Sequence, residues 1–149
     1  MKKLTIAIFI VCLNINAAEQ SVVHKKIIDH LSYLGYLAKI NNGTIIVKHP
    51  TKPGFDIIQT RGGIVLRAWF KHKKNSLSQK TAYLELVNRI NISSIVSKYT
   101  IDSQNDLVIT ACYPLPYYKE SFSVFISAWE TDFIKNSTAY AEELGKYIE

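Results

Sequence analysis

The feature that most constrains the fold is a strict alternation of side chains from Ile64 to Lys71. The apolar set on one face of an extended chain is Ile64, Leu66, Ala68 and Phe70. The opposite face carries Val65, Arg67, Trp69 and Lys71. A period of two residues is typical of a strand that is buried on one face only. The sequence therefore predicts a half-buried strand that leaves Trp69 on its polar side.

Turn signals divide the preceding sequence into further strands. Asn41-Asn42-Gly43 offers residues that tolerate the positive φ of a tight hairpin, and Arg61-Gly62-Gly63 marks a second turn. The strands predicted between the turns and the proline-rich break at 50–54 are Thr44–His49 and Phe55–Thr60, with Tyr36–Ile40 as a candidate short strand. Together with Ile64–Lys71 they form an antiparallel meander.

A second hairpin is expected further along the chain. Its strands are Ser94–Ile101 and Asp106–Tyr113, and a polar turn at 102–105 separates them. The side chains expected to point inward are Ile95, Tyr99, Ile101, Leu107, Ile109 and Ala111. Cys112 lies in an apolar run, so we expect it to be a small buried residue, with a redox or intermolecular thiol as the alternative.

Three segments have apolar residues at helical spacing. They cover 19–34, which Gly35 ends, 77–92, which Ser76 caps, and a long helix from about Lys119. The third carries an aromatic stripe that indicates core packing, formed by Phe122, Phe125, Ile126, Trp129 and Phe133. We expect this helix to break or fray near Asn136-Ser137-Thr138, before a final amphipathic piece at 140–148. The order α-β-β-β-α-β-β-α predicts an α+β fold, an antiparallel sheet of about five strands covered by helices.

The first eighteen residues are predicted to be a secretory signal peptide. Lys2 and Lys3 precede a short apolar run, and Ala17-Ala18 supplies small residues for cleavage. Residues 19–149 then form a single domain, located in the periplasm or secreted by a bacterium, with no stable membrane anchor. Removal of the two lysines lowers the formal net charge from +6 to +4, which is too mild to argue for nucleic acid or lipid.

No catalytic, cofactor or metal site is predicted. The histidines His24, His30, His49 and His72 lack metal-ligand spacing, and we expect them to be solvated. No Gly-x-Ser-x-Gly elbow or phosphate loop occurs. The basic run 71–74 is either a solvated loop or a patch that binds anions, and nucleic acid is not an expected ligand outside the cytoplasm.

The stretch from about Leu31 to Lys135 contains a recognisable series of elements. A helix ends in Leu84-Glu85-Leu86-Val87-Asn88-Arg89-Ile90-Asn91, a strand and a polar turn follow, and then come Asp106-Leu107-Val108-Ile109-Thr110 and the aromatic helix 122–133. This series resembles the YbjN-like family, whose fold is that of type III secretion chaperones. The family's asparagine near the end of the helix would be Asn88 or Asn91. The resemblance implies a protein-binding or regulatory module without cofactors, although cytoplasmic members lack a signal peptide.

We therefore expect an exported, non-enzymatic domain that binds another protein. The residues predicted to contact the partner are Val65, Arg67, Trp69, Lys71, Tyr117 and Tyr118. One alternative is a small periplasmic ligand-binding protein or enzyme, with a pocket under the aromatic helix that contains Trp129. A structural role, or homodimerisation through an open sheet edge, is a further alternative.

Overall fold

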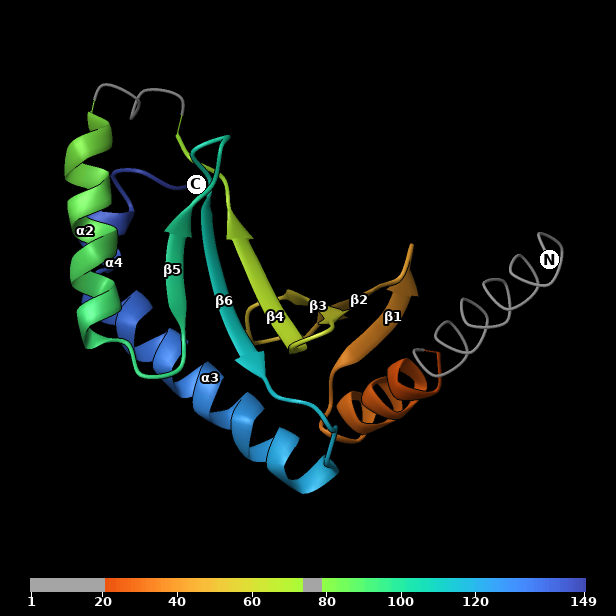
Figure 1. The fold of residues 1–149 in the computed structure, drawn as a ribbon. Helices are drawn as coiled ribbons and strands as arrows, with labels where there is room; N and C mark the ends of the chain where they lie inside the picture. The colour runs from red at the N-terminus through yellow and green to blue at the C-terminus, as the bar shows by residue number, and fades with distance from the viewer. Residues whose placement is uncertain (1–20, 74–78) are drawn as a thin grey trace, which may run out of the picture.

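The chain folds into a six-stranded antiparallel sheet with helices packed against it (Figure 1), in a computed structural model that describes residues 21–73 and 79–149. The strands are β1 (Leu37–Asn41), β2 (Thr44–Lys48), β3 (Phe55–Thr60), β4 (Gly63–Phe70), β5 (Lys98–Ile101) and β6 (Leu107–Tyr113). Their spatial order is β1-β2-β3-β4-β6-β5. The predicted α+β class is confirmed. The sheet has six strands instead of about five because β1 pairs with β2 along its whole length.

The helical segments are residues 21–33, α2 (Lys80–Ser93), α3 (Lys119–Ala139) and the short α4 (Ala141–Leu144). Ser76, the predicted cap of the second helix, lies outside the described residues. The break expected near residues 136–138 comes slightly later, because α3 ends at Ala139 and α4 follows it. Asn136 is buried, and its side-chain amide donates to the carbonyl of Asp132 one turn earlier. Within the described parts of the chain, no helix has the length and apolarity needed to cross a membrane.

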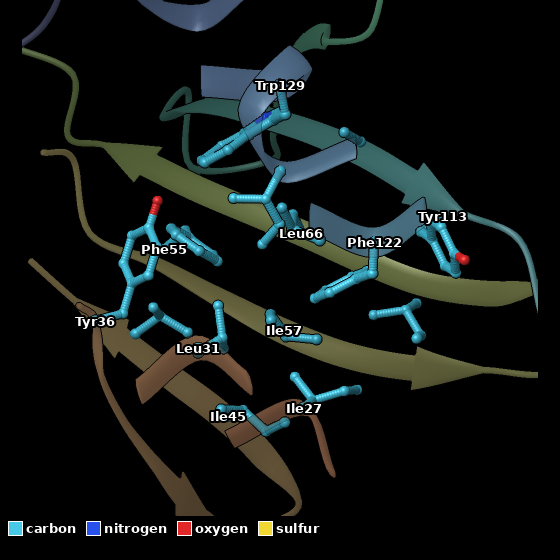
Figure 2. Packing of buried hydrophobic residues seen from close by; sticks show 14 of the residues in the cluster. Ile27, Leu31, Tyr36, Ile45, Phe55, Ile57, Leu66, Tyr113, Phe122 and Trp129 are labelled. Atoms are coloured by element: carbon cyan, nitrogen blue, oxygen red, sulfur yellow. The ribbon is translucent and has the colours of Figure 1, made fainter. Parts of the chain in front are cut away.

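The four helical segments of the described chain pack on one face of the sheet. The residues 21–33 and α3 contribute Ile27, Leu31, Phe122 and Trp129 to a core that also holds Ile45, Ile57 and Leu66 of the strands (Figure 2). A second cluster joins α2 and α4 to β5 and β6 through Leu86, Leu144, Tyr99 and Ile109. The aromatic stripe of α3 is therefore core, as predicted. Burying the many apolar side chains of these two clusters is the main stabilising contribution to the fold.

Two turns that the sequence predicted are present. Asn42 and Gly43 have φ values of 47° and 77° between the paired residues Asn41 and Thr44, so the β1–β2 hairpin turns through left-handed residues. Gly35 has a φ of 87° after the helix at 21–33, and the amide of Tyr36 donates to the carbonyl of Leu31. That arrangement is a helix C-terminus closed by a left-handed residue.

The segment before β5 departs from the prediction because Asp132 binds it. The Asp132 carboxylate accepts hydrogen bonds from the amides of Ile95 (3.1 Å), Val96 (3.0 Å) and Ser97 (2.7 Å), and from the Ser94 hydroxyl (2.8 Å). These amides cannot also join a sheet, so β5 begins at Lys98. Ile95 is 85% exposed, and its predicted inward position is wrong.

The other inward positions of the second hairpin are confirmed. Tyr99, Leu107, Ile109 and Ala111 are buried, and Ile101 is half-buried. Asn91 holds the β5 edge. Its side-chain amide donates to the carbonyl of Tyr99 (2.8 Å), and its side-chain oxygen accepts from the Tyr99 amide (2.8 Å). Of the two asparagines that the sequence left open, Asn91 is thus the one that joins α2 to the following strand.

Two histidines predicted to be solvated are buried, namely His24 and His30. The His30 ring nitrogens lie 2.7 Å from the Tyr117 hydroxyl and 2.7 Å from the Ser123 hydroxyl. Burial lowers the pKa of His30, and the nearby Lys119 lowers it further. His30 is therefore a link between the helix at 21–33, the loop after β6 and α3. Helical spacing did not reveal this role, because its partners lie far away in sequence.

Candidate docking face of the sheet

The face of the sheet opposite the helices is covered by no helix of the described chain. Alternation along each strand places one set of side chains there, and we call this set the open face. Its members away from the hairpin turns are Leu37, Lys39, Ile46, Lys48, Asp56, Ile58, Val65, Arg67, Trp69, Lys98, Thr100, Val108, Thr110 and Cys112. The predicted outward face of β4 is thus part of a surface that runs across all the strands.

Trp69 is the most conspicuous member of the open face. It is 44% exposed, and the Arg67 guanidinium lies over its ring at 4.5 Å from the centroid. Arg67 is itself held by Asp56 through two parallel hydrogen bonds, from Nε to Oδ1 (3.0 Å) and from Nη2 to Oδ2 (3.0 Å). A bidentate pair fixes the guanidinium plane, and a fixed plane fixes the ring beneath it. The exposed Trp69 ring is therefore restrained by a cation–π contact to a fixed guanidinium.

Every charged residue of the six strands lies on the open face. The cations are Lys39, Lys48, Arg67 and Lys98, and the anion is Asp56. The strand register places Lys39, Ile46, Asp56, Arg67, Thr110 and Lys98 in one continuous row from β1 to β5. The open face consequently has an excess of positive charge with a lysine at each end of its central row.

A hollow of about 490 Å³ continues the open face at its β1 end. Its lining includes Leu37, Lys39, Ile46 and Lys48, together with Tyr36 at the end of the preceding turn. The first four of these belong to the open face. The surface is therefore concave where it approaches the edge of the sheet, and both apolar and cationic groups reach the hollow.

Cys112 is exposed, so its predicted burial is wrong. It lies beside Val65 on the open face, because β6 has one buried and one open side. An apolar run such as Leu107–Tyr113 resembles a strand that is buried on both faces. Here Val108 and Cys112 belong instead to an open face that is itself partly apolar.

The structure separates the six residues predicted to contact a partner. It brings Val65, Arg67 and Trp69 together, and Lys71 is exposed just after β4, where its carbonyl accepts from the Glu149 amide. Tyr117 lies in the helical layer, packed on Phe122, with its hydroxyl at His30. Tyr118 is exposed directly before α3. The two tyrosines are therefore not part of the open face.

Two hollows lie along the middle and the C-terminal end of α3, and Trp129 lines neither of them. The first, of about 590 Å³, is lined by α3 residues such as Val124 and by Ile95 of the loop before β5. The second, of about 270 Å³, is lined by Phe70, Phe133 and Leu144, among others, and is smaller than the ~300–1,000 Å³ usual for pockets that enclose a small organic ligand. Trp129 is 1% exposed and packs on Phe55 and Phe133. A ligand site that depends on Trp129 therefore has no geometric support.

One cluster of titratable groups lies on the helical side. The Tyr36 hydroxyl donates to Glu130, and Lys52 donates to both the Tyr36 oxygen (3.1 Å) and Glu130 (2.9 Å). Burial raises the pKa of Tyr36 to about 12, with a further contribution from the hydrogen bond to Glu130, so the phenol stays protonated at neutral pH. The cluster ties the loop after β2 to α3. Across residues 21–73 and 79–149, no group of three or more potential ligands is arranged to hold a metal ion.

The fold is similar to that of YbjN, a proposed transcription regulator from E. coli, as seen in its crystal structure. The similarity has a TM-score of 0.67 at 15% sequence identity, and it covers 84% of this chain and 94% of that one. No protein-family model matches the chain, and no curated protein matches it either. At this level of identity the comparison establishes a shared fold, in agreement with the resemblance noted in the sequence.

Proposed function

We propose that this chain, which shares the fold of YbjN, is an exported, non-enzymatic module that binds another protein through the open face. The observation that carries the proposal is the fixed position of Trp69. An exposed tryptophan that packs against an arginine, which is in turn held by an aspartate, is restrained in one orientation before any partner arrives. Fixed Trp and Arg side chains are the residues that most often dominate binding energy at protein interfaces.

The two tryptophans of the chain have opposite environments. Trp129 fills the core between α3 and the sheet, so its removal would leave a cavity. Trp69 lies on the outer side of the sheet, and within residues 21–73 and 79–149 the Arg67 guanidinium is the one aromatic or cationic group that packs on its ring. The fold does not need a tryptophan at position 69, which supports a role in contact with another molecule.

YbjN's proposed role in transcription suggests a regulatory variant of the same proposal. A protein-binding module can regulate the activity of its partner by binding to it. In this variant of the proposal, the open face is the surface that binds the regulated partner. The predicted signal peptide distinguishes this chain from a DNA-binding regulator, because export removes it from DNA. Cell fractionation tests that step: the mature protein should leave the cytoplasm, whereas deletion of residues 2–18 should retain it there.

Replacement of Trp69 by alanine is expected to abolish partner capture and to leave the fold intact. The side chain is only partly buried, so we expect the free energy of unfolding to fall by about 1 kcal/mol. The partner should be lost because a central aromatic side chain at an interface contributes about 2 kcal/mol or more. The measurement is in-cell crosslinking and pull-down of the tagged mature protein, with urea unfolding of the same variant.

Leu84→Ala is the matched control. Leu84 is 43% exposed on α2, on the helical side of the molecule. The variant therefore loses an apolar side chain of similar exposure at a site away from the open face. The Leu84 variant should capture the partner at the wild-type level. Equal capture by all three proteins would contradict the proposal, and so would an unfolded Trp69→Ala variant, since that result would make Trp69 a core residue.

A further inference from the structure

We infer that the partner presents an acidic, extended segment to the open face, with a carboxylate bound by Arg67 beside Trp69. This inference rests on the proposed function and names the chemistry of its partner. The strands place four cations and one anion on the open face, and the anion is already paired with Arg67. Attraction across such a surface selects negatively charged partners and accelerates their association.

Arg67 retains hydrogen-bonding capacity for a ligand. The bonds to Asp56 use Nε and one hydrogen of Nη2. A guanidinium has five N–H donors, so both hydrogens of Nη1 and the second hydrogen of Nη2 have no partner among the bonds of the described chain. One hydrogen of Nη1 and the second hydrogen of Nη2 form the other bidentate edge of the guanidinium, which matches a carboxylate. The Arg67 side chain is about one-quarter exposed (28%), so this edge is within reach.

The central row sets the length of the segment. It runs from Lys39 on β1 to Lys98 on β5, with Arg67 between them. Five gaps of ~4.8 Å between strands give a row of about 24 Å. An extended chain advances ~3.3 Å per residue, so about eight residues span the row. Acidic side chains at the ends and centre of such a segment would meet one cation each.

Apolar groups on either side of the row favour a polypeptide over other polyanions. Ile58, Val65 and Cys112 form a neighbouring row, and Trp69 and Val108 form another. A peptide can cover these groups with apolar side chains that alternate with its acidic ones. A phosphate backbone would bind the cations and leave the apolar rows in water, without the gain from burying them.

The test measures binding of synthetic peptides to the mature protein. The first peptide has about eight residues that alternate Glu with Val or Tyr. The second carries Gln in place of each Glu. We expect the Glu peptide to bind at low salt, to weaken as salt is raised, and to bind about tenfold more tightly than the Gln peptide. Fluorescence should report the site, because Trp69 is exposed and Trp129 is buried.

Arg67→Ala and Arg67→Lys locate the contact. The alanine variant should lose about tenfold in affinity for the Glu peptide. The lysine variant keeps the charge and a partner for Asp56, so it should fold normally and bind with intermediate affinity. Lys25→Ala is the control, because Lys25 is exposed on the helix at 21–33 and its removal lowers the net charge equally. It should bind like the wild type.

Each alternative outcome overturns the inference in a recognisable way. Equal binding of the Glu and Gln peptides would show that the peptide carboxylates do not contribute to binding. Equal loss of affinity for the Glu peptide in the Lys25 and Arg67 variants would show that Arg67 makes no specific contact with a carboxylate. Tight binding of a short DNA duplex or of anionic lipid vesicles in place of the peptide would assign the face to another polyanion. Absence of peptide binding would reject the acidic partner. That result would leave the proposed function intact as long as wild type captures a partner protein and the folded Trp69→Ala variant does not.

Discussion

Asp132→Ala is expected to destabilise the protein by about 3–5 kcal/mol, a large part of the stability of a domain of this size. The carboxylate accepts hydrogen bonds from three backbone amides and from the Ser94 hydroxyl, and Asn136 donates a fifth at 3.1 Å. Asp132 is buried, so its removal leaves these donors without a partner and away from water. The measurement is urea unfolding followed by circular dichroism.

Asp29→Ala provides the matched comparison. Asp29 is an exposed aspartate on the helix at 21–33, and its removal should change the free energy of unfolding by no more than about 0.5 kcal/mol. If Asp132→Ala were as stable as Asp29→Ala, the loop at 94–97 would be held by something other than the carboxylate. The late start of β5 at Lys98 would then have another cause than the hydrogen bonds to Asp132.

The stability contributed by Asp132 is expected to disappear in acid. Burial alone would raise the pKa of Asp132, but hydrogen bonds from Ser97, Ser94, Ile95 and Val96 outweigh burial and lower it from 3.8 to about 2. A carboxyl group whose pKa is lowered by folding stabilises the protein fully above its unfolded pKa. The contribution, about 2 kcal/mol, is lost as pH falls from about 4 to about 2.

The acid effect is measured as a difference between two proteins. Wild type should lose about 2 kcal/mol more than Asp132→Asn when both are unfolded by urea at about pH 5 and again at about pH 2. The asparagine variant has no charge to lose at that position, so its remaining pH dependence reports all the other groups. Parallel pH profiles for the two proteins would show that the carboxylate is not held in its charged form.

Gly63→Ala is the second substitution with a large expected effect, a loss of about 2–4 kcal/mol. A Cβ at Gly63 would lie 2.4 Å from the Tyr113 carbonyl oxygen and 3.0 Å from the Cys112 Sγ. The residue also has a φ of 157°, which residues with a side chain seldom adopt. The clash is with the backbone of β6, so relief requires β4 and β6 to move apart. Thermal unfolding should show a lower Tm.

Gly62→Ala is the control that distinguishes the steric clash at Gly63 from a general effect of placing alanine in this turn. A Cβ at Gly62 would meet only the Thr60 hydroxyl, at 4.0 Å. Gly62→Ala should therefore unfold within about 0.5 kcal/mol of the wild type. If both alanine variants were equally destabilised, the cause would be the turn itself. Equal stability of both would show that β4 and β6 are not in close contact at Gly63.

Local patterns were sufficient to predict the parts of the structure that depend on neighbouring residues. The alternation of β4 placed Trp69 and Arg67 outside the core, and Asn42-Gly43 predicted the first hairpin. Partners far apart in sequence explain most of the errors. Asp132 binds amides at 95–97, more than thirty residues earlier, and reshapes that segment. No local signal distinguishes such an aspartate from a solvated one.

The candidate site was predicted only in part for a related reason. The outward side of β4 is visible in the sequence, but its neighbours depend on the order of the strands. Asp56 and Thr110 lie beside Arg67 because β3 and β6 flank β4. Tyr117 was assigned to the site as an aromatic residue in a proline-containing loop, whereas its hydroxyl is a partner of the buried His30. Composition alone does not decide which layer a tyrosine joins.

The most direct test of the open face uses the thiol at Cys112. This residue is exposed beside Val65, and a benzophenone attached to it would reach a molecule bound there. A second protein carries Cys112→Ser and Leu84→Cys, which moves the same label to the helical side. The labelled mature proteins are irradiated with an extract of the compartment to which the chain is exported. The label at position 112 should crosslink a specific partner, and the label at position 84 should crosslink none. A partner crosslinked equally from both positions, or from position 84 alone, would contradict docking on the open face.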